Sequence, residues 1–106
     1  MAQVKWQNRA EQELYRYLVK GFQEFGEKTA NKFAERVEYI SRNLEKFPEI
    51  GYPEPLLKDR SKRYRTYHIN KRFDLIYYYE ESRDIVHVAD IWDTRRKPES
   101  LANRIK

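Results

Sequence analysis

The hydrophobic pattern of the second half of the chain is that of a sheet. Three runs rich in aromatic and β-branched residues, at positions 64–69, 72–79 and 85–92, are separated by short polar breaks. Such residues favour half-buried strands, and breaks of a few residues favour antiparallel hairpins between neighbouring runs. The pattern therefore predicts a three-stranded antiparallel meander between Tyr64 and Arg96, with the earlier part of the chain covering one of its faces.

Alternation along the middle run assigns its two faces. The odd positions are expected to face the core, namely Phe73, Leu75, Tyr77 and Tyr79. The even positions are expected to face water or a partner, namely Asp74, Ile76 and Tyr78. In the last run, Val88 and Ile91 are three residues apart instead of two, which predicts a β-bulge near Ala89 and Asp90.

The first half of the chain repeats its hydrophobic positions about every 3.6 residues, as amphipathic helices do. One helix is predicted to begin at Asn8, which makes a capping-box pattern with Glu11, and to end at Gly26. A second follows from Ala30 and is stopped by Pro48. The short break between them predicts an antiparallel helical hairpin.

Three shorter segments complete the expected fold. Residues 3–6 alternate like an edge strand, residues 48–55 form a Pro- and Gly-rich connector, and residues 98–104 form a short C-terminal helix. The fold class is therefore α+β, with an N-terminal strand, a helical hairpin packed on a mainly antiparallel sheet, a three-stranded C-terminal meander and a short C-terminal helix. The length of 106 residues suits a single domain, residues 1–106.

The charge of the chain is unevenly distributed. It has 22 Lys and Arg against 17 Asp and Glu, a net charge of +5. Residues 1–53 carry nine basic and eight acidic side chains (+1), whereas residues 54–106 carry thirteen and nine (+4). The excess on the sheet half favours an anionic partner such as nucleic acid or an acidic protein, and a solvated surface that aids solubility is the alternative.

Composition excludes several classes of protein. There is no cysteine, so a disulfide framework and a thiolate metal site are impossible, which fits a cytoplasmic location. No signal peptide is expected at the N-terminus, and every apolar run is too short to span a membrane. The three glycines are isolated and the two histidines stand on different strands, so neither a phosphate-binding loop nor a metal site is predicted and no cofactor is expected.

Basic and aromatic side chains gather at the start of the meander. Between residues 58 and 72, seven Lys and Arg are opposed only by Asp59, and tyrosines are interleaved with them. Such a mixture grips phosphate and stacks bases, or else it protects an edge strand from aggregation. It also suits RNA cleavage without a metal, in which two side chains move protons and arginines stabilise the charge on phosphorus. The same residues would serve equally to bind an acidic partner.

Several short motifs, taken in order, resemble the RelE/ParE superfamily, the toxins of type II toxin–antitoxin modules. The resemblance covers nearly the whole chain. Its motifs are Val4-Lys5-Trp6, Ala10-x-x-x-Leu14, Ala30-x-x-Phe33, Leu44-x-x-x-Pro48-x-x-Gly51, Tyr64-Arg65-x-Tyr67, Leu75-Ile76-Tyr77, and Ile91-x-Asp93-x-Arg95 with Pro98 just after.

The resemblance implies a small toxin that arrests growth and is neutralised by a cognate antitoxin protein encoded beside it. RelE-like members are ribosome-dependent endoribonucleases that cut messenger RNA, whereas ParE-like members inhibit DNA gyrase. Two hypotheses about the target follow, and a third is a small, non-toxic domain of the same fold that binds RNA or an acidic peptide.

The superfamily's basic positions are matched only in part. Arg65 matches the basic position on the first strand of the meander, and Arg95 or Arg96 matches the arginine after the last strand. Asp74 stands where RelE-like members carry an arginine, and nothing after Trp92 is Tyr or His. These departures favour a ParE-like inhibitor, or a divergent nuclease that uses His87 or a strand tyrosine.

Two sets of site residues follow from this match. The residues expected to bind nucleic acid or a protein target are Arg63, Arg65, Tyr67, Arg72, Arg95 and Arg96. The catalytic residues, if the chain is a nuclease, are Arg65, Arg95 and His87. Arg65 and Arg95 are both expected to be solvated.

Overall fold

The structure is a computed structural model, and it describes residues 1–105 of the chain. The predicted α+β fold, with its mainly antiparallel sheet, is confirmed. The helices and strands are β1 (Gln3–Trp6), α1 (Asn8–Phe25), α2 (Glu27–Lys46), β2 (Tyr52–Pro53), β3 (Tyr64–His68), β4 (Phe73–Glu80), β5 (Ile85–Asp93) and α3 (Pro98–Arg104), with two short 3-10 helices, η1 (Pro55–Leu57) and η2 (Glu81–Arg83).

The sheet has five strands in the order β1-β5-β4-β3-β2. The predicted meander of β3, β4 and β5 is confirmed, and β1 is added beside β5 as a parallel edge strand. The strand β2 was not predicted. It has only two residues, Tyr52 and Pro53, which pair with Thr66 and Arg65 inside the Pro-rich connector. A run this short leaves no alternation to read in a sequence.

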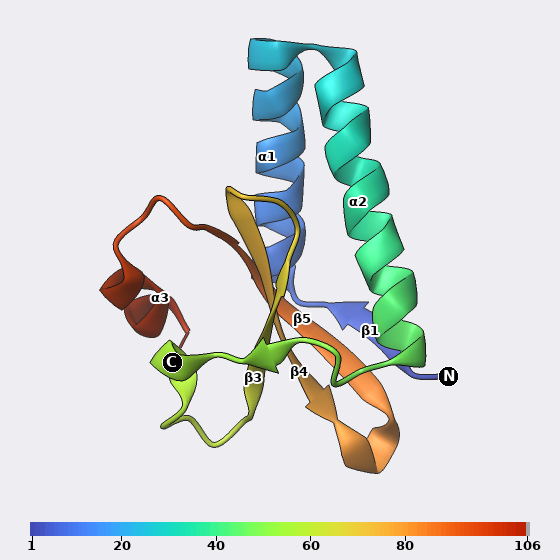
Figure 1. The fold of residues 1–106 in the computed structure, drawn as a ribbon, viewed down its shortest axis with the longest axis vertical. Helices are drawn as coiled ribbons and strands as arrows, with labels where there is room; N and C mark the ends of the chain where they lie inside the picture. Colours follow the sequence, from blue (N-terminus) through green and yellow to red (C-terminus); the bar gives the residue numbers. More distant parts are fainter. Residues whose placement is uncertain (106) are drawn as a thin grey trace.

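The helices α1 and α2 form the predicted antiparallel hairpin, and its Gly26 end extends beyond the sheet (Figure 1). Gly26 has φ 92°, a conformation that glycine adopts without strain, and it separates the two helices as expected. The helix α2 ends at Lys46, just before Pro48, also as expected.

The predicted capping box at Asn8 and Glu11 is wrong. The residue that caps α1 is Gln7, and its side chain makes no capping hydrogen bond. Its backbone N–H donates to the carbonyl of Val88 on β5, while its carbonyl accepts from the N–H of Glu11. The extended chain of β1 therefore runs directly into the helix, and strand pairing fixes the start of α1.

One hydrophobic core lies between the helical hairpin and the sheet. Ala10 of α1 and Ile40 and Leu44 of α2 are fully buried against Leu75 and Tyr77 of β4, together with Val86, Val88 and Ile91 of β5. The odd positions of β4 thus face this core, as alternation predicted.

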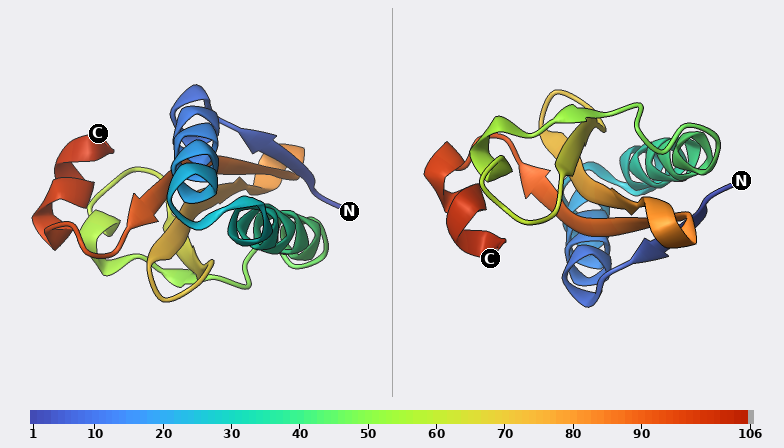
Figure 2. Two further views of the ribbon diagram at one scale, coloured as in Figure 1. Left: turned by 90° about the horizontal axis from the view of Figure 1, so that it is seen from above. Right: turned by 90° about the horizontal axis from the view of Figure 1, so that it is seen from below.

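A second core covers the opposite face of the sheet, where water or a partner was expected. Ile76 is fully buried, and Asp74 is only 8% exposed. The residues that bury Ile76 are Leu57 of η1, Ala89 and Trp92 of β5, and Leu101 and Ile105 at α3. The expectation was wrong because alternation identifies two faces but not a small helix that covers the second. In both views of Figure 2, α3 and α2 lie at opposite ends of the molecule.

The predicted bulge in β5 is confirmed and helps to attach α3. The register changes from Ile76 opposite Asp90 to Tyr77 opposite Val88, which leaves Ala89 as the extra residue. The fully buried Asp90 carboxylate accepts two hydrogen bonds from Arg104, from Nε at 2.5 Å and from Nη2 at 3.0 Å. These bonds raise the pKa of Arg104 above its ordinary value.

Replacing Arg104 by alanine should leave the Asp90 carboxylate buried without its cation. Removing one partner of a buried ion pair typically costs about 3–5 kcal/mol of unfolding free energy. We expect Arg104→Ala to show a loss of this size in urea unfolding, whereas Arg42→Ala, which breaks the exposed Arg42–Glu38 pair on α2, should cost about 0.5 kcal/mol or less. Equal losses in the two variants would contradict this role for Asp90.

Candidate functional site

Arg65 binds the connector and not solvent, so the expectation that it is solvated is wrong. Its side chain is only 23% exposed. Nη1 donates to the carbonyl oxygens of Gly51 at 2.7 Å and Glu49 at 3.1 Å. In the register, Arg65 lies opposite Tyr77, whose hydroxyl accepts a hydrogen bond from the Gly51 N–H at 2.8 Å. Arg65 and Tyr77 together hold the connector against the sheet.

The other binding candidates have different surroundings. The Tyr67 hydroxyl accepts a hydrogen bond from Asn43 of α2 at 3.0 Å, and its ring packs against the first core. Arg63 is exposed in the loop before β3. The Arg96 guanidinium lies 4.8 Å from the centre of the Trp92 ring.

His87 lies on the face of the sheet opposite Arg65. It pairs with Tyr78, the neighbour of Tyr77 along β4, so its side chain is on the face that α3 partly covers. Its Nε2 lies 2.8 Å from a carboxylate oxygen of Glu80. Hydrogen bonds from Arg83 and His87 lower the pKa of Glu80 to about 2.

The structure therefore does not bring Arg65, His87 and Arg95 together. The first two are on opposite faces of the sheet, and Arg95 follows the end of β5, whereas His87 lies near its beginning. Acid–base catalysis requires its groups within hydrogen-bond reach of the same reacting atoms. These three residues do not meet that requirement as a set.

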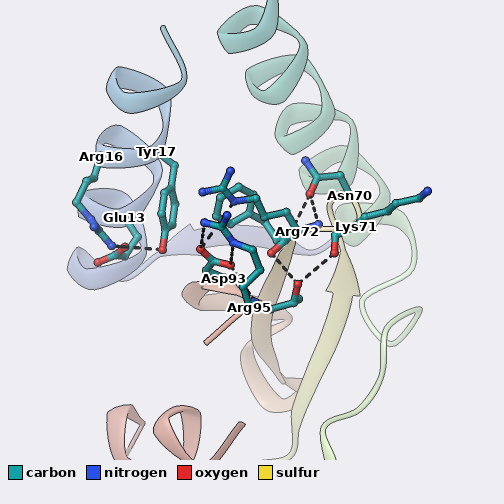
Figure 3. Close-up of polar contacts among 10 residues, drawn as sticks. Glu13, Arg16, Tyr17, Asn70, Lys71, Arg72, Asp93 and Arg95 are labelled. Atoms are coloured by element: carbon teal, nitrogen blue, oxygen red, sulfur yellow. Dashed lines mark hydrogen bonds and ion pairs between the residues drawn. The ribbon is translucent and has the colours of Figure 1, made fainter. Parts of the chain in front are cut away.

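Two of the predicted arginines do meet, at the end of β5, in a group that we call the Arg72–Asp93 cluster: Arg72, Asp93 and Arg95 (Figure 3). Arg95 donates to Asp93 Oδ1 from Nε at 3.2 Å and to Oδ2 from Nη2 at 3.1 Å. Arg72 lies on the same carboxylate, with its Nε 3.8 Å from Oδ2. Its guanidinium lies 5.2 Å from the centre of the Phe73 ring.

The turn between β3 and β4 is attached to the end of β5, which fixes the position of this cluster. Asn70 Oδ1 accepts hydrogen bonds from the backbone N–H groups of Arg72 at 2.8 Å and Phe73 at 2.9 Å. The N–H of Thr94 donates to the Arg72 carbonyl at 2.8 Å, and its hydroxyl donates to the Lys71 carbonyl at 3.1 Å. The two arginines are therefore presented by a rigid support.

The single carboxylate of the Arg72–Asp93 cluster does not neutralise its two guanidinium groups. Burial alone would raise the pKa of Asp93, but hydrogen bonds from Arg95 and the charge of Arg72 outweigh it and lower the pKa below its ordinary value of 3.8. Arg95 remains 62% exposed. Arg72 Nε is buried and has no hydrogen-bond acceptor among residues 1–105. One carboxylate thus faces two arginines, and the cluster carries a net positive charge.

A second polar surface lies on the face of the sheet that carries His87. The rings of Tyr78 and His87 stack at 4.7 Å, Tyr64 meets Tyr78 edge-on at 5.4 Å, and Lys62 Nζ lies 4.9 Å from the Tyr78 ring. We call this group the aromatic row. It borders a polar cleft of about 730 Å³ that Arg9, Lys62 and Tyr64 help to line.

Sequence reasoning identified the arginines but not the residues that organise them. Asp93 belonged to a motif without being proposed as a site residue, and Asn70 was not proposed at all. The Asn–Lys pair at positions 70 and 71 marks a turn, and this signal could have predicted an Asn side chain bonded to the following backbone. Tyr64 and Tyr78 become neighbours only through strand register, which alternation within single strands does not give.

Residues 1–105 contain neither a candidate metal cluster nor a helix able to cross a membrane. Within residues 1–105, no group of three or more His, Cys, Asp and Glu side chains is placed to hold a metal ion. None of the helices in this part of the chain combines the length and the apolar character needed to cross a membrane.

Residues 4–98 match a family model described as the ParE toxin of the type II toxin-antitoxin system, parDE. No curated protein matches the chain.

Solved structures share the fold at low sequence identity. A metal-bound toxin from Helicobacter pylori superposes with a TM-score of 0.68 at 14% sequence identity, and the match covers 90% of this chain and 97% of that one. A chain of the chromosomal ParDE system from P. aeruginosa has a TM-score of 0.69 at 16% sequence identity. The match covers 88% of this chain and 96% of that one. A YoeB/ParE toxin from Agrobacterium tumefaciens has a TM-score of 0.62 at 19% sequence identity. The match covers 86% of this chain and 96% of that one.

The lowered pKa of Asp93 makes a pH-dependent contribution to stability. Because the pKa in the folded state lies below 3.8, the stabilisation is present above that pH and is lost as the pH falls through the lowered pKa. We expect Asp93→Asn to lose about 1–3 kcal/mol of unfolding free energy at pH 6, and the difference from wild type to shrink toward pH 2. Urea unfolding across this range measures it, with the exposed Asp59→Asn as control. A difference independent of pH would contradict the assignment.

Proposed function

The chain belongs to the family of ParE toxins of type II toxin–antitoxin systems, and from this premise we propose that it arrests growth by binding DNA gyrase until a cognate antitoxin neutralises it. In this proposal the toxin acts in the cytoplasm as one domain, residues 1–106, and carries out no chemistry of its own. The observation that carries the proposal is the match of the ParE toxin model to residues 4–98.

The separation of the three nuclease candidates supports a mechanism without catalysis. Arg65 is occupied by connector carbonyls on one face of the sheet, and His87 is occupied by Glu80 on the other. A toxin that acts by occupying a target protein needs no converging acid and base. It needs a rigid surface that the target recognises.

The Arg72–Asp93 cluster is the proposed contact surface for gyrase. Its guanidinium groups are fixed by Asp93 and by the β3–β4 turn, so little side-chain freedom is lost when a partner binds. Arginine is also among the residues that most often dominate the energetics of protein interfaces. Arg96, an exposed cation just after Arg95, would extend the contact.

Gyrase supercoiling assays with purified toxin test this proposal. We expect wild-type toxin to inhibit supercoiling and Arg95→Ala to require at least about tenfold more protein for the same inhibition, which corresponds to about 1.4 kcal/mol of binding free energy.

The matched control for this assay is Arg83→Ala. Arg83 and Arg95 are both 62% exposed and both pair with a carboxylate, but Arg83 precedes β5 whereas Arg95 follows it. We expect Arg83→Ala to inhibit like wild type. Gyrase that is unaffected by saturating wild-type toxin would refute the proposed function, and full inhibition by Arg95→Ala would refute only the proposed contact surface.

The aromatic row favours a second candidate, ribosome-dependent cleavage of messenger RNA. Bases stack on aromatic side chains, and Lys62 beside Tyr78 would attract phosphate. His87, held by Glu80, would be the proton-transferring group.

Pulse-labelling after induced expression separates the two candidates. A fall in DNA synthesis with intact messages would support gyrase as the target. A fall in protein synthesis, with messages cut inside ribosomes, would support the second candidate, and His87→Ala should then reduce cleavage about 10²–10⁴-fold. Unimpaired growth without antitoxin would contradict both and favour a non-toxic RNA- or peptide-binding domain.

A further inference from the structure

A glycine one turn before the end of α1 has no structural reason in the free protein. Gly21 is still a helical residue, followed by four more in α1, and at a helical position glycine is less favourable than alanine because it loses more conformational freedom on folding. A Cβ atom built at this position would meet no described atom within 4 Å. By contrast, a Cβ at Gly51 would lie 2.6 Å from the Thr66 carbonyl oxygen, so Gly51 is required by packing.

Gly21 forms part of the wall of a small cavity between the helical hairpin and the β3–β4 turn. This Gly21 cavity has a volume of about 170 Å³ and is lined by Tyr17, Lys20, Gly21, Glu24, Phe25, Thr29, Asn70, Arg72 and Phe73. Inside it the Phe73 ring contacts Tyr17, with ring centres 4.4 Å apart. An apolar cavity of about 150 Å³ is large enough to hold benzene, so the Gly21 cavity suits one large apolar side chain.

The charges at the cavity favour an acidic partner. Lys20 and Arg72 line it, against one carboxylate, Glu24. The Arg72 side chain is 31% exposed, so a partner can reach it. Arg95 stands next to Arg72 in the Arg72–Asp93 cluster and is largely exposed. A carboxylate that follows an apolar side chain in a partner would pair with the exposed part of the Arg72 guanidinium.

We propose that the Gly21 cavity is the anchor site for the antitoxin. An acidic segment of the antitoxin places one apolar side chain against Phe73, a carboxylate at Arg72, and its backbone close to the bare helix surface at Gly21. The inference rests on the proposed function, because that function requires a neutralising antitoxin.

This placement also explains how binding would neutralise the toxin. Arg72 belongs both to the cavity lining and to the proposed gyrase contact. An antitoxin seated in the Gly21 cavity covers Arg72 and lies beside Arg95. Neutralisation is then direct competition for the same cations, with no change of fold.

The test combines two measurements on substitutions of Gly21. Gly21→Ala should raise the melting temperature of the free toxin by about 2–6 °C, because alanine favours the helix and its methyl group has room. The same substitution should weaken binding of the antitoxin encoded beside the toxin gene, measured by calorimetry. Gly21→Leu, which projects a large side chain into the partner's space, should weaken it at least thirtyfold, the loss expected at an interface hot spot.

Gln23→Leu is the matched control, because Gln23 is exposed on the same helix and does not line the cavity. It should bind antitoxin like wild type. A folded Gly21→Leu toxin with wild-type affinity would overturn the inference, as would a lowered melting temperature in Gly21→Ala or an antitoxin that fails to bind the wild-type toxin. The gyrase assay on wild-type toxin tests the proposed function separately, so the two failures are distinguishable.

Discussion

The fold depends on burying both faces of its two central strands. Both β4 and β5 are buried over most of their length, with no open face of the kind common in antiparallel sheets. The helical hairpin covers one face, and the other requires η1, α3 and the Asp90–Arg104 ion pair. The sheet is therefore covered by the short C-terminal helix on one face as well as by the long hairpin on the other. The bulge at Ala89 allows one strand to serve both cores.

Most of the fold could be predicted because its signals are local. Alternation identified the strands, the helical period and Gly26 identified the hairpin, and the spacing of Val88 and Ile91 revealed the bulge. The errors all concern contacts between segments distant in sequence. A hydrogen bond to Val88 replaced the expected cap at Asn8, and α3 covered the even positions of β4. Neither contact leaves a periodic trace in the sequence.

The same limit applies to two arginines of the candidate site. Arg65 and Arg95 both belong to motifs shared with the toxin superfamily, yet the former binds backbone carbonyls of the connector and the latter remains at the surface beside Asp93. Residue type predicted that these side chains would bind oxygen atoms. Whether those oxygens belong to the chain itself or are left to a partner depends on the path of residues 48–55, which only the folded structure defines.

The pairing of β1 with β5 joins the first strand to the last strand in sequence and delays the completion of the fold during synthesis. Gln3 pairs with Ile85, and the Arg9 side chain donates to the carbonyl of Arg104. At about 5–20 residues per second, the N-terminal strand waits several seconds for its partner to leave the ribosome. Contacts this distant in sequence also slow folding itself. A nascent copy that still lacks residues 85–105 is thus an incomplete toxin, because it can neither pair its edge strand nor secure α3.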